Sequence, residues 1–141
     1  MAKVAINELG GFTDVIKLDF NDLIAIGNGG SRVIAKIPAQ GAVELAGVAE
    51  TVAVVGSSSL VIDVGTTSAD PDEFIDALDV DAMTVPVFNT GDQFTSGYSK
   101  AVKAVASETE VYVKVTDAAI ASITAGEVVI GLRIIDLAKF A

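Results

Sequence analysis

The sequence predicts an all-β fold: a single-domain antiparallel β-sandwich, jelly-roll-like, with at most one short helix near residues 70–79. Apolar and polar residues alternate with a period of two in several short segments, which is typical of strands. Turn-forming residues separate these segments at the spacing of a sandwich. The 141 residues, 51% of them hydrophobic, suffice for one buried core. We therefore expect one domain over residues 1–141, with residues 1–12 as an extended N-terminal arm.

The N-terminal third of the chain predicts three strands. Residues 13–20 and 31–37 alternate between apolar and polar side chains, and residues 23–26 form a shorter apolar segment between them. The Gly-Asn-Gly-Gly sequence at residues 27–30 is a strong turn signal. These glycines lack the spacing of a phosphate-binding loop and lead into a strand rather than a helix, so a hairpin is the better interpretation.

The next two strands flank a serine-rich turn. Residues 42–55 are rich in β-branched side chains, and Ala46 and Gly47 within them indicate a bulge or bend. Residues 56–59 form a Gly/Ser turn into a strand over residues 60–64. A serine triplet could suggest a nucleophile, but the chain has no histidine to activate one, so turn formation is the better explanation.

The expected helix rests on a capping pattern. Asp70 suits an N-cap, Pro71 the first helical position, and Glu73 the reciprocal position of a capping box. These acids would also lie at the positive end of the helix dipole. The pattern predicts a short helix near residues 70–79.

Calcium is the alternative interpretation of the same segment, because six acids lie between Asp70 and Asp81. Asp70 and Asp72 would be its first ligands. An EF-hand loop needs glycine at its sixth position and an oxygen ligand at its fifth, where this chain has Ile75 and Phe74. We therefore favour helix capping and predict no metal site.

The C-terminal half predicts further strands with ambiguous segments between them. Residues 84–88 form a strand candidate whose proline belongs at an edge, and residues 110–116 alternate clearly. Residues 93–107 and 117–123 remain open between strand and helix. Residues 128–135 are apolar on both faces except for one arginine, so this strand is either central in its sheet or covered by a partner subunit.

The net charge of −10 comes from the middle of the chain. No Lys or Arg occurs between Lys36 and Lys100, whereas the remaining residues carry nine acids and nine bases. The ten acids of this middle segment are Glu44, Glu50, Asp63, Asp70, Asp72, Glu73, Asp76, Asp79, Asp81 and Asp92. With only nine scattered basic residues, nucleic-acid binding is disfavoured. Solubility accounts for most of the excess negative charge.

The residue types exclude most catalytic chemistry. The chain has no Cys and no His, which removes thiolate nucleophiles, disulfides and the usual acid–base catalyst. Asp63, Asp79 and Asp81 could in principle form a carboxylate pair, but solvated surface is the simpler interpretation. We predict no catalytic residues, no cofactor and no enzymatic activity. No apolar run has the length of a signal peptide or membrane span, so no membrane association is expected.

Residues 37–82 resemble a stretch of the small head-decoration, or cement, proteins of tailed bacteriophages. The resemblance consists of the Pro38/Gly41 turn, the turn at residues 56–59, the Gly65-Thr66 strand end and the Asp-rich loop at residues 70–74. The closing strands are also similar, so the resemblance covers about two-thirds of the chain. It implies a jelly-roll protomer that trimerises, has no enzyme activity, and binds the major capsid protein on the outer capsid surface after synthesis in the host cytoplasm.

Two other functions stay open. A ligand- or carbohydrate-binding β-sandwich on a virion or cell surface is the alternative, although the absence of Trp leaves few stacking platforms for sugars. A small carboxylate-dependent hydrolase ranks third. For the decoration protein, we expect the acidic middle segment to face solvent and an N- or C-terminal strand region to contact other subunits.

Overall fold

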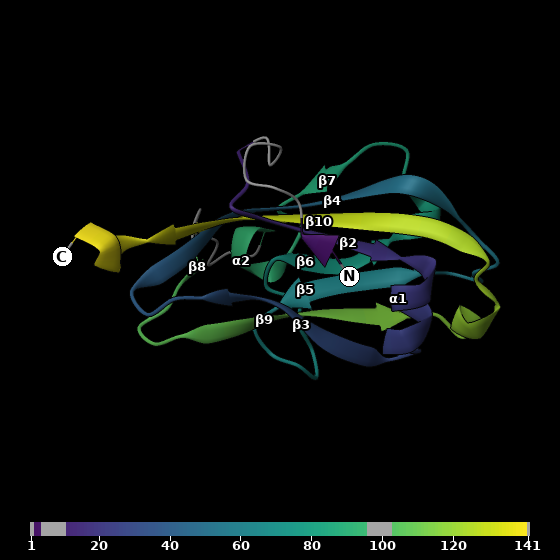
Figure 1. Cartoon of the computed structure of the whole chain (residues 1–141), viewed down its shortest axis with the longest axis horizontal. Coiled ribbons are helices and arrows are strands. Elements are labelled where there is room, and N and C mark those ends of the chain that lie inside the picture. The colour runs from purple at the N-terminus through teal and green to yellow at the C-terminus, as the bar shows by residue number, and fades with distance from the viewer. Residues whose placement is uncertain (1, 4–10, 96–102, 141) are drawn as a thin grey trace.

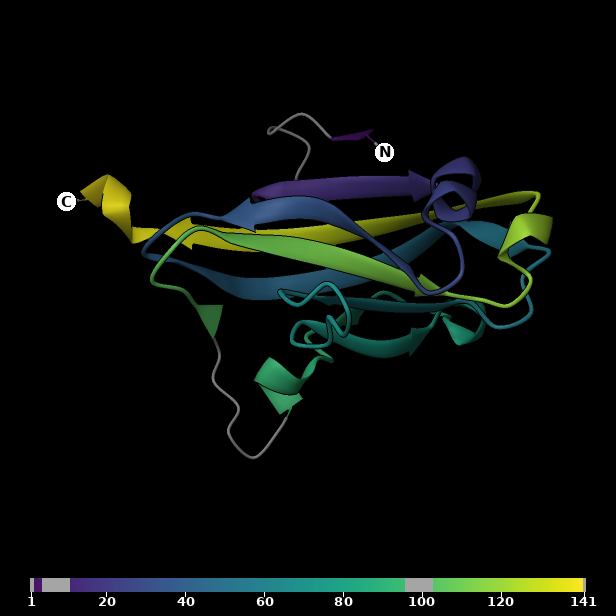
Figure 2. The ribbon, with the colours of Figure 1, turned by 90° about the horizontal axis from the view of Figure 1, so that it is seen from below.

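The computed structural model describes residues 2–3, 11–95 and 103–140, which form two antiparallel sheets packed face to face. One sheet has the order β1-β2-β10-β4-β7, with β8 also paired to β4, and the other has the order β3-β9-β5-β6. Figure 1 shows the first sheet above the second, and Figure 2 looks onto the second sheet with the first behind it. The strands are β1 (Ala2–Lys3), β2 (Asp14–Asp19), β3 (Gly30–Ile37), β4 (Gly41–Val55), β5 (Val61–Gly65), β6 (Ile75–Asp79), β7 (Val87–Phe88), β8 (Lys103–Ala104), β9 (Thr109–Thr116) and β10 (Ala125–Asp136).

The strand pairs are nested within one another. β5 pairs with β6, β4 with β7, β3 with β9 and β2 with β10, all antiparallel. The chain therefore resembles one long hairpin whose strand pairs are distributed over the two sheets: β2–β10 and β4–β7 in the first, and β3–β9 and β5–β6 in the second. This is the jelly-roll arrangement, and the predicted all-β sandwich is confirmed.

The core lies between the two sheets and is built from one face of each. β10 contributes Val128, Ile130 and Leu132, and β9 contributes Val111, Val113 and Val115, all fully buried. Side chains two residues apart lie on the same face of a strand, so these three residues of each strand share the core-facing side. Phe74 is the largest of the fully buried side chains.

β10 is the central strand of its sheet, since it pairs with β2 on one side and with β4 on the other. This confirms one of the two positions predicted for residues 128–135, because neighbouring strands and the second sheet cover them. Two of its outward residues are nevertheless apolar as well: Val129 is half-buried and Gly131 is buried. That outer face is described below.

The helix predicted near residues 70–79 is wrong. Residues 75–79 form β6, and residues 70–74 form an irregular loop before it. Phe74 and Ile75 are fully buried, and the Phe74 amide donates to the carbonyl oxygen of Val64 at 2.9 Å. Burial of these two side chains and pairing with β5 outweigh a local capping pattern, because most helical stability comes from tertiary packing.

A helix occurs instead where a strand was predicted, at residues 23–26. α1 (Phe20–Ile26) begins after Asp19, whose carboxylate accepts from the Asp22 amide, while the Asp22 carboxylate accepts from the Asp19 amide. This reciprocal capping box, together with the buried Leu23, stabilises the helix. Figures 1 and 2 show α1 at the same end of the sandwich as η3 (Ile120–Ser122).

The bulge predicted at Ala46 and Gly47 is also wrong. These residues pair regularly with Leu132 and Gly131 of β10. The register shifts lie on either side of them, between Val43 and Leu45, and again beyond Glu50. Gly47 instead accommodates an aromatic ring, as described below.

The remaining predictions concern the segments left open. Of the predicted strand at residues 84–88 only β7 is a strand, and the segment at residues 93–107 contains the end of α2 (Asp92–Thr95) and β8. Its residues 96–102 lie outside the described ranges. So do residues 1 and 4–10 of the predicted N-terminal arm, whereas β1 pairs with β2. The other short helices are η2 (Val80–Ala82) and η4 (Leu137–Phe140).

Candidate interaction surface

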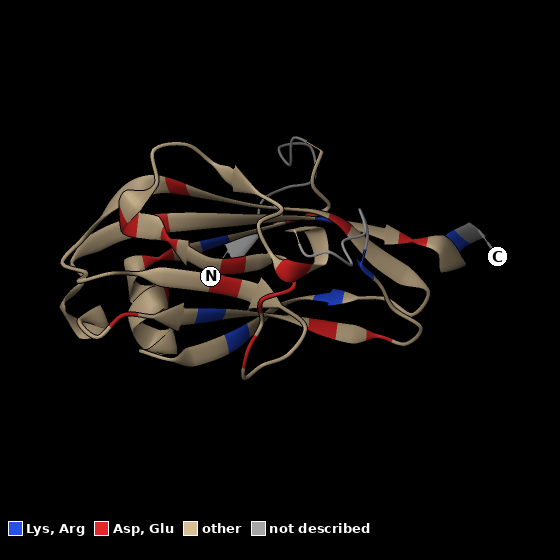
Figure 3. Cartoon of the chain, turned by 180° about the vertical axis from the view of Figure 1, so that it is seen from behind, with Lys and Arg blue, Asp and Glu red and all other residues tan. Residues whose placement is uncertain are grey.

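The acids considered for calcium do not gather around a cation position. Asp70 is exposed, and burial followed by the negative charges of Asp92 and Asp70 raises the pKa of Asp72 to about 6. Within the described ranges, no group of three or more Asp or Glu side chains has the arrangement of a metal site. Figure 3 shows the acidic residues distributed over many strands and loops.

Glu73 anchors the strand end at Gly65 and Thr66 instead of capping a helix. Its carboxylate accepts from the Thr66 amide at 2.8 Å and from the Thr66 hydroxyl. A Cβ on Gly65 would lie 2.4 Å from Glu73 Oε1, so only glycine fits there. The Gly-Thr pair and the acid therefore belong to one structural contact between β5 and the loop that precedes β6.

The serine turn is held by Asp117, a residue that the sequence did not single out. Asp117 is 2% exposed, and its Oδ1 accepts from the Ser58 amide and hydroxyl, the Ser59 amide and the Ala119 amide. Burial alone would raise the pKa of Asp117, but these hydrogen bonds outweigh it and lower the pKa below its ordinary value. The serines thus serve a structural role in joining two loops.

Each of the three acids considered for a catalytic pair accepts a hydrogen bond from a backbone amide. Asp63 accepts from the Ala77 amide at 2.7 Å, Asp79 accepts from the Asp81 amide, and Asp81 accepts from the Leu60 amide at 3.0 Å. Burial is the main reason why the pKa of Asp63 is raised, although the Ala77 hydrogen bond opposes it. These are loop and strand contacts, and each of the three carboxylates accepts from a different backbone amide.

The strongest surface feature lies on the outer face of the first sheet, where two glycines pair. Gly47 of β4 lies directly opposite Gly131 of β10. A Cβ on Gly47 would lie 2.6 Å from a ring carbon of Phe88, and one on Gly131 would lie 2.9 Å from a ring carbon of Phe12. The two rings therefore lie against the glycine backbone, as aromatic residues do beside glycines in sheets.

These residues border a groove of about 290 Å³. None of its lining side chains is charged or carries a polar atom. The groove, which we call the apolar groove, is lined by Phe12, Val15, Gly47, Val48, Ala49, Pro86, Phe88, Val129 and Gly131. Phe88 is 51% exposed, which is unusual for a large apolar side chain on a protein surface.

Charged residues border the apolar groove without entering it. Lys17 is exposed and pairs with Val129 in the ladder between β2 and β10. Two residues along β10 from Gly131, Arg133 donates to Glu44 at 3.3 Å. An apolar centre with a charged border is the anatomy of a protein-binding surface.

The outer face of the second sheet is different in character. Lys114 of β9 lies opposite Asp63 of β5, and Lys36 of β3 lies 3.7 Å from Glu108. Lys36 and Glu108 are both exposed, and such a pair is typical of a solvated surface. The contrast makes the first sheet the candidate interaction face.

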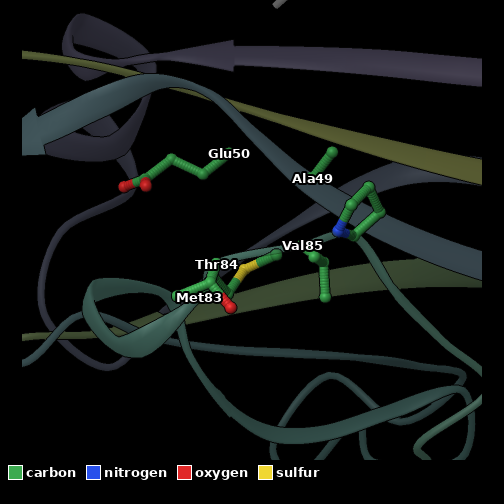
Figure 4. Close-up of a pocket in the computed structure, with 6 residues that line it drawn as sticks. Ala49, Glu50, Met83, Thr84 and Val85 are labelled. Atoms are coloured by element: carbon green, nitrogen blue, oxygen red, sulfur yellow. The ribbon is translucent and has the colours of Figure 1, made fainter.

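A second, smaller cavity adjoins the apolar groove and shares Ala49 and Pro86 with it. Its volume is about 150 Å³, and Met83 and Glu50 also line it. Figure 4 shows that Ala49 and Glu50 come from β4, whereas Met83, Thr84 and Val85 come from the facing segment. Val85 is 66% exposed, so the apolar surface extends beyond the groove.

The sequence did not single out the groove residues as a site. Strand periodicity shows which residues share a face, but Gly47 and Gly131 are far apart in the chain, and only the β4–β10 register brings them together. One feature of the sequence did point to this surface. Residues 128–135 are apolar on both faces, which is compatible with a partner subunit covering the outer face.

No family model and no curated protein matches this chain. Among solved structures, it is similar to a chain of the capsid of Ralstonia phage GP4, with 12% sequence identity and a TM-score of 0.49. The match covers 96% of this chain and 91% of that chain. At this identity and score, the likeness does not bear on function. No helix in the described ranges is long and apolar enough to cross a membrane.

Proposed function

We propose that this chain is a structural virion protein of a tailed bacteriophage: a decoration or cement protein. It trimerises, binds the major capsid protein on the outer surface of the capsid lattice, and stabilises that lattice. The apolar groove is the contact surface in this proposal. The chain carries out no catalysis.

The observation that carries the proposal is the apolar outer face of the first sheet. Four groove residues belong to the terminal strand regions, two near the N-terminus and two in β10, whereas the other five belong to the middle segment that was expected to face solvent: Gly47, Val48, Ala49, Pro86 and Phe88. Removing apolar area from water on binding contributes about 25 cal/mol per Å², from which the entropic cost of association is subtracted. A partner protein is the natural cover, because exposed apolar patches mark interaction sites.

Two further features support a structural role. The jelly roll is an architecture that viral capsid proteins use, although lectins and cupins use it too. The resemblance of residues 37–82 to head-decoration proteins points to the same class. The carboxylates that might have suggested catalysis, Asp63, Asp79 and Asp81, all accept hydrogen bonds from backbone amides.

To stabilise the lattice, one decoration trimer must contact several capsid subunits at once. A trimer presents three copies of the groove, so that modest individual contacts give strong retention through effective concentration. Because such a trimer binds only the assembled lattice, it shifts the equilibrium between dissociated and assembled capsid subunits toward the lattice.

Sedimentation with capsids that lack this protein tests the proposal. We expect the wild-type chain to pellet with the capsids and Phe88→Ser to lose most of that binding, since Phe88 is a half-exposed ring on a two-residue edge strand. Tyr112→Ser is the matched control, because it removes an aromatic ring from the other sheet. A wild-type chain that stays in the supernatant would overturn the decoration proposal.

Light scattering tests trimerisation separately. We expect about three times the chain mass of 14.4 kDa at micromolar protein. A monomeric mass would contradict the trimer but would not contradict capsid binding, which the sedimentation experiment tests.

A ligand- or carbohydrate-binding module remains the second candidate, since Phe12 and Phe88 flank the groove. Sugar sites combine aromatic faces with convergent polar groups. The groove lining has no polar side chain, which ranks this candidate lower. Binding on a glycan array without capsid binding would reverse the order.

A further inference from the structure

Phe88 is held at the apolar groove by a strand of only two residues. β7 pairs with β4 at two positions, with Phe88 opposite Gly47 and Val87 opposite Val48. The Phe88 side chain is 51% exposed, so packing against the protein covers only part of it. Exposed side chains change rotamer within picoseconds to nanoseconds when nothing restrains them. The position of the Phe88 ring over Gly47 therefore depends on how the ends of β7 are fixed.

Asn89 fixes one end of β7 with two hydrogen bonds to a single residue of β4. The Asn89 amide donates to the Ala46 carbonyl oxygen at 2.9 Å, and the Asn89 side-chain Oδ1 accepts from the Ala46 amide at 2.9 Å. In a regular antiparallel pair, this second bond would go to a backbone carbonyl oxygen. The side chain of Asn89 therefore takes the place of its own carbonyl group in the ladder.

The backbone conformation of Asn89 explains this replacement. Its φ is 51°, in the left-handed region, which asparagine tolerates because its short side chain can bond to nearby backbone groups. The chain leaves the first sheet at this point, and the Gly91 amide donates to the carbonyl oxygen of Phe74, the residue before β6. Asn89 thus ends β7 sharply and still provides an acceptor for the amide of the buried Ala46.

The other end of β7 is limited by Pro86. Proline fixes its own φ and has no amide to donate, so the paired segment begins after it. Pro86 and Phe88 both line the apolar groove. β7 is thus confined between a rigid residue and a residue that is bonded through both its backbone and its side chain.

The rings that form the walls of the groove meet at Gly47. A Cβ on Gly47 would lie 2.6 and 2.7 Å from two ring carbons of Phe88, and 3.6 Å from a ring carbon of Phe12. These rings come from two segments that are far apart in the chain. A groove whose walls are fixed before binding does not have to be ordered by its partner, which favours affinity.

We propose that Asn89 is a positioning residue for partner binding: it holds Phe88 on Gly47 and so keeps the apolar groove preformed. Its role in binding rests on the proposed function of the groove. The positioning itself does not, because the bonds to Ala46 and the place of the ring can be measured without a partner. Asn89 acts through Phe88 and need not contact the partner.

Nuclear Overhauser effects (NOEs) between the Phe88 ring protons and the Gly47 α-protons test the positioning. We expect strong NOEs in the wild-type chain. Asn89→Gly keeps the left-handed backbone but removes the side-chain acceptor, so it should lose most of the NOE intensity. The same variant should speed exchange of the Ala46 amide about fivefold, the equivalent of one hydrogen bond of about 1 kcal/mol. Asn89→Asp keeps an acceptor oxygen and tolerates the same φ, so it should behave as the wild-type chain does.

Gln40→Gly is the matched control. Gln40 also has a positive φ, of 61°, and its side chain donates to the carbonyl oxygen of Ala106 at 3.2 Å. This change should leave the NOEs between Phe88 and Gly47 unaltered. NOEs between Phe12 and Gly131 are the reference within each sample, since that ring lies against the other glycine of the pair. A general loss of stability would leave both sets of NOEs in the folded molecules.

Sedimentation with capsids measures the role in binding. Asn89→Gly should pellet with capsids less than the wild-type chain, whereas Asn89→Asp should pellet as the wild-type chain does. Unchanged NOEs in Asn89→Gly, or an equal loss in Asn89→Asp, would overturn the positioning role. Full capsid binding by Asn89→Gly despite lost NOEs would overturn its part in binding. If the wild-type chain bound no capsids, the proposed function would fail, and the NOEs would still decide whether Asn89 positions Phe88.

Discussion

At the level of single residues, glycines mark where another group passes too close for a side chain. Gly91 and Gly131 represent two kinds of contact. At Gly91 the obstacle is the backbone of Glu73 and Phe74, whereas at Gly131 it is the ring of Phe12. A backbone cannot yield as a side chain can, so the two positions differ in what they tolerate.

We predict that Gly91→Ala lowers the free energy of unfolding by roughly 2–4 kcal/mol, because a Cβ there forces the two segments apart. Gly131→Ala should cost about 1 kcal/mol, since the Phe12 ring can shift. Urea denaturation of both variants measures the difference. Equal losses would show that the close approach at Gly91 is not what limits substitution.

The negative charge of Asp117 strengthens the hydrogen bonds that join the serine turn to the loop after β9. Asp117→Asn keeps the shape but weakens four charge-assisted hydrogen bonds, so we predict a loss of about 1–3 kcal/mol near pH 7. Because the folded-state pKa is lowered, the stabilisation is present above about pH 3.9 and is lost as the pH falls through the folded value.

Chemical denaturation of wild-type and Asp117→Asn at neutral pH and near pH 3 checks this prediction. The gap between the two chains should narrow in acid. A gap that stays constant over that range would mean that the charge of Asp117 contributes little.

At the level of elements, the chain contains two capping patterns, and only one starts a helix. Asp19 and Asp22 form the observed capping box of α1, while Asp70 and Glu73 have the same spacing and begin no helix. We therefore predict that Asp19→Ala costs about 1 kcal/mol, a typical value for an N-cap, and that Asp70→Ala costs nothing measurable. Thermal unfolding of the two variants separates them, and a comparable loss in both would contradict the loop at residues 70–74.

This pair of patterns shows what the sequence could and could not predict. Alternation identified β2, β3, β5 and β9, because a strand with one buried face must alternate, whereas β10 was predicted from a run that is apolar on both faces. Capping is a local signal of about 1 kcal/mol, and burial of Phe74 and Ile75 outweighs it. The helix α1 was missed because its apolar residues also suit a short strand.

The candidate site was harder to predict than the fold. The apolar groove depends on the pairing of Gly47 with Gly131 and on rings from two other segments that lie against them. Register between distant strands is a property of the folded sheet, and local periodicity does not contain it. Asp117 was missed for the same reason, because its partners Ser58 and Ser59 lie in another loop.

At the level of the whole molecule, a net charge of −10 on 141 residues opposes compactness. Added salt screens this repulsion, so we predict that the melting temperature near pH 7.5 rises between low salt and about 0.5 M sodium chloride. Near pH 5, closer to the isoelectric point of about 4.2, the rise should be smaller. Differential scanning calorimetry measures both, and an equal rise at the two pH values would indicate a salt effect other than charge screening.

The nested pairing also determines when the protein can fold during its synthesis. β2 is made early but pairs with β10, and β4 pairs with β10 over most of its length, so the first sheet lacks its central strand until β10 has left the ribosome. Until then, no strand lies between β2 and β4, and their core-facing side chains can associate with other exposed apolar segments. Chains that end before β10 should therefore be substrates for chaperones and proteases.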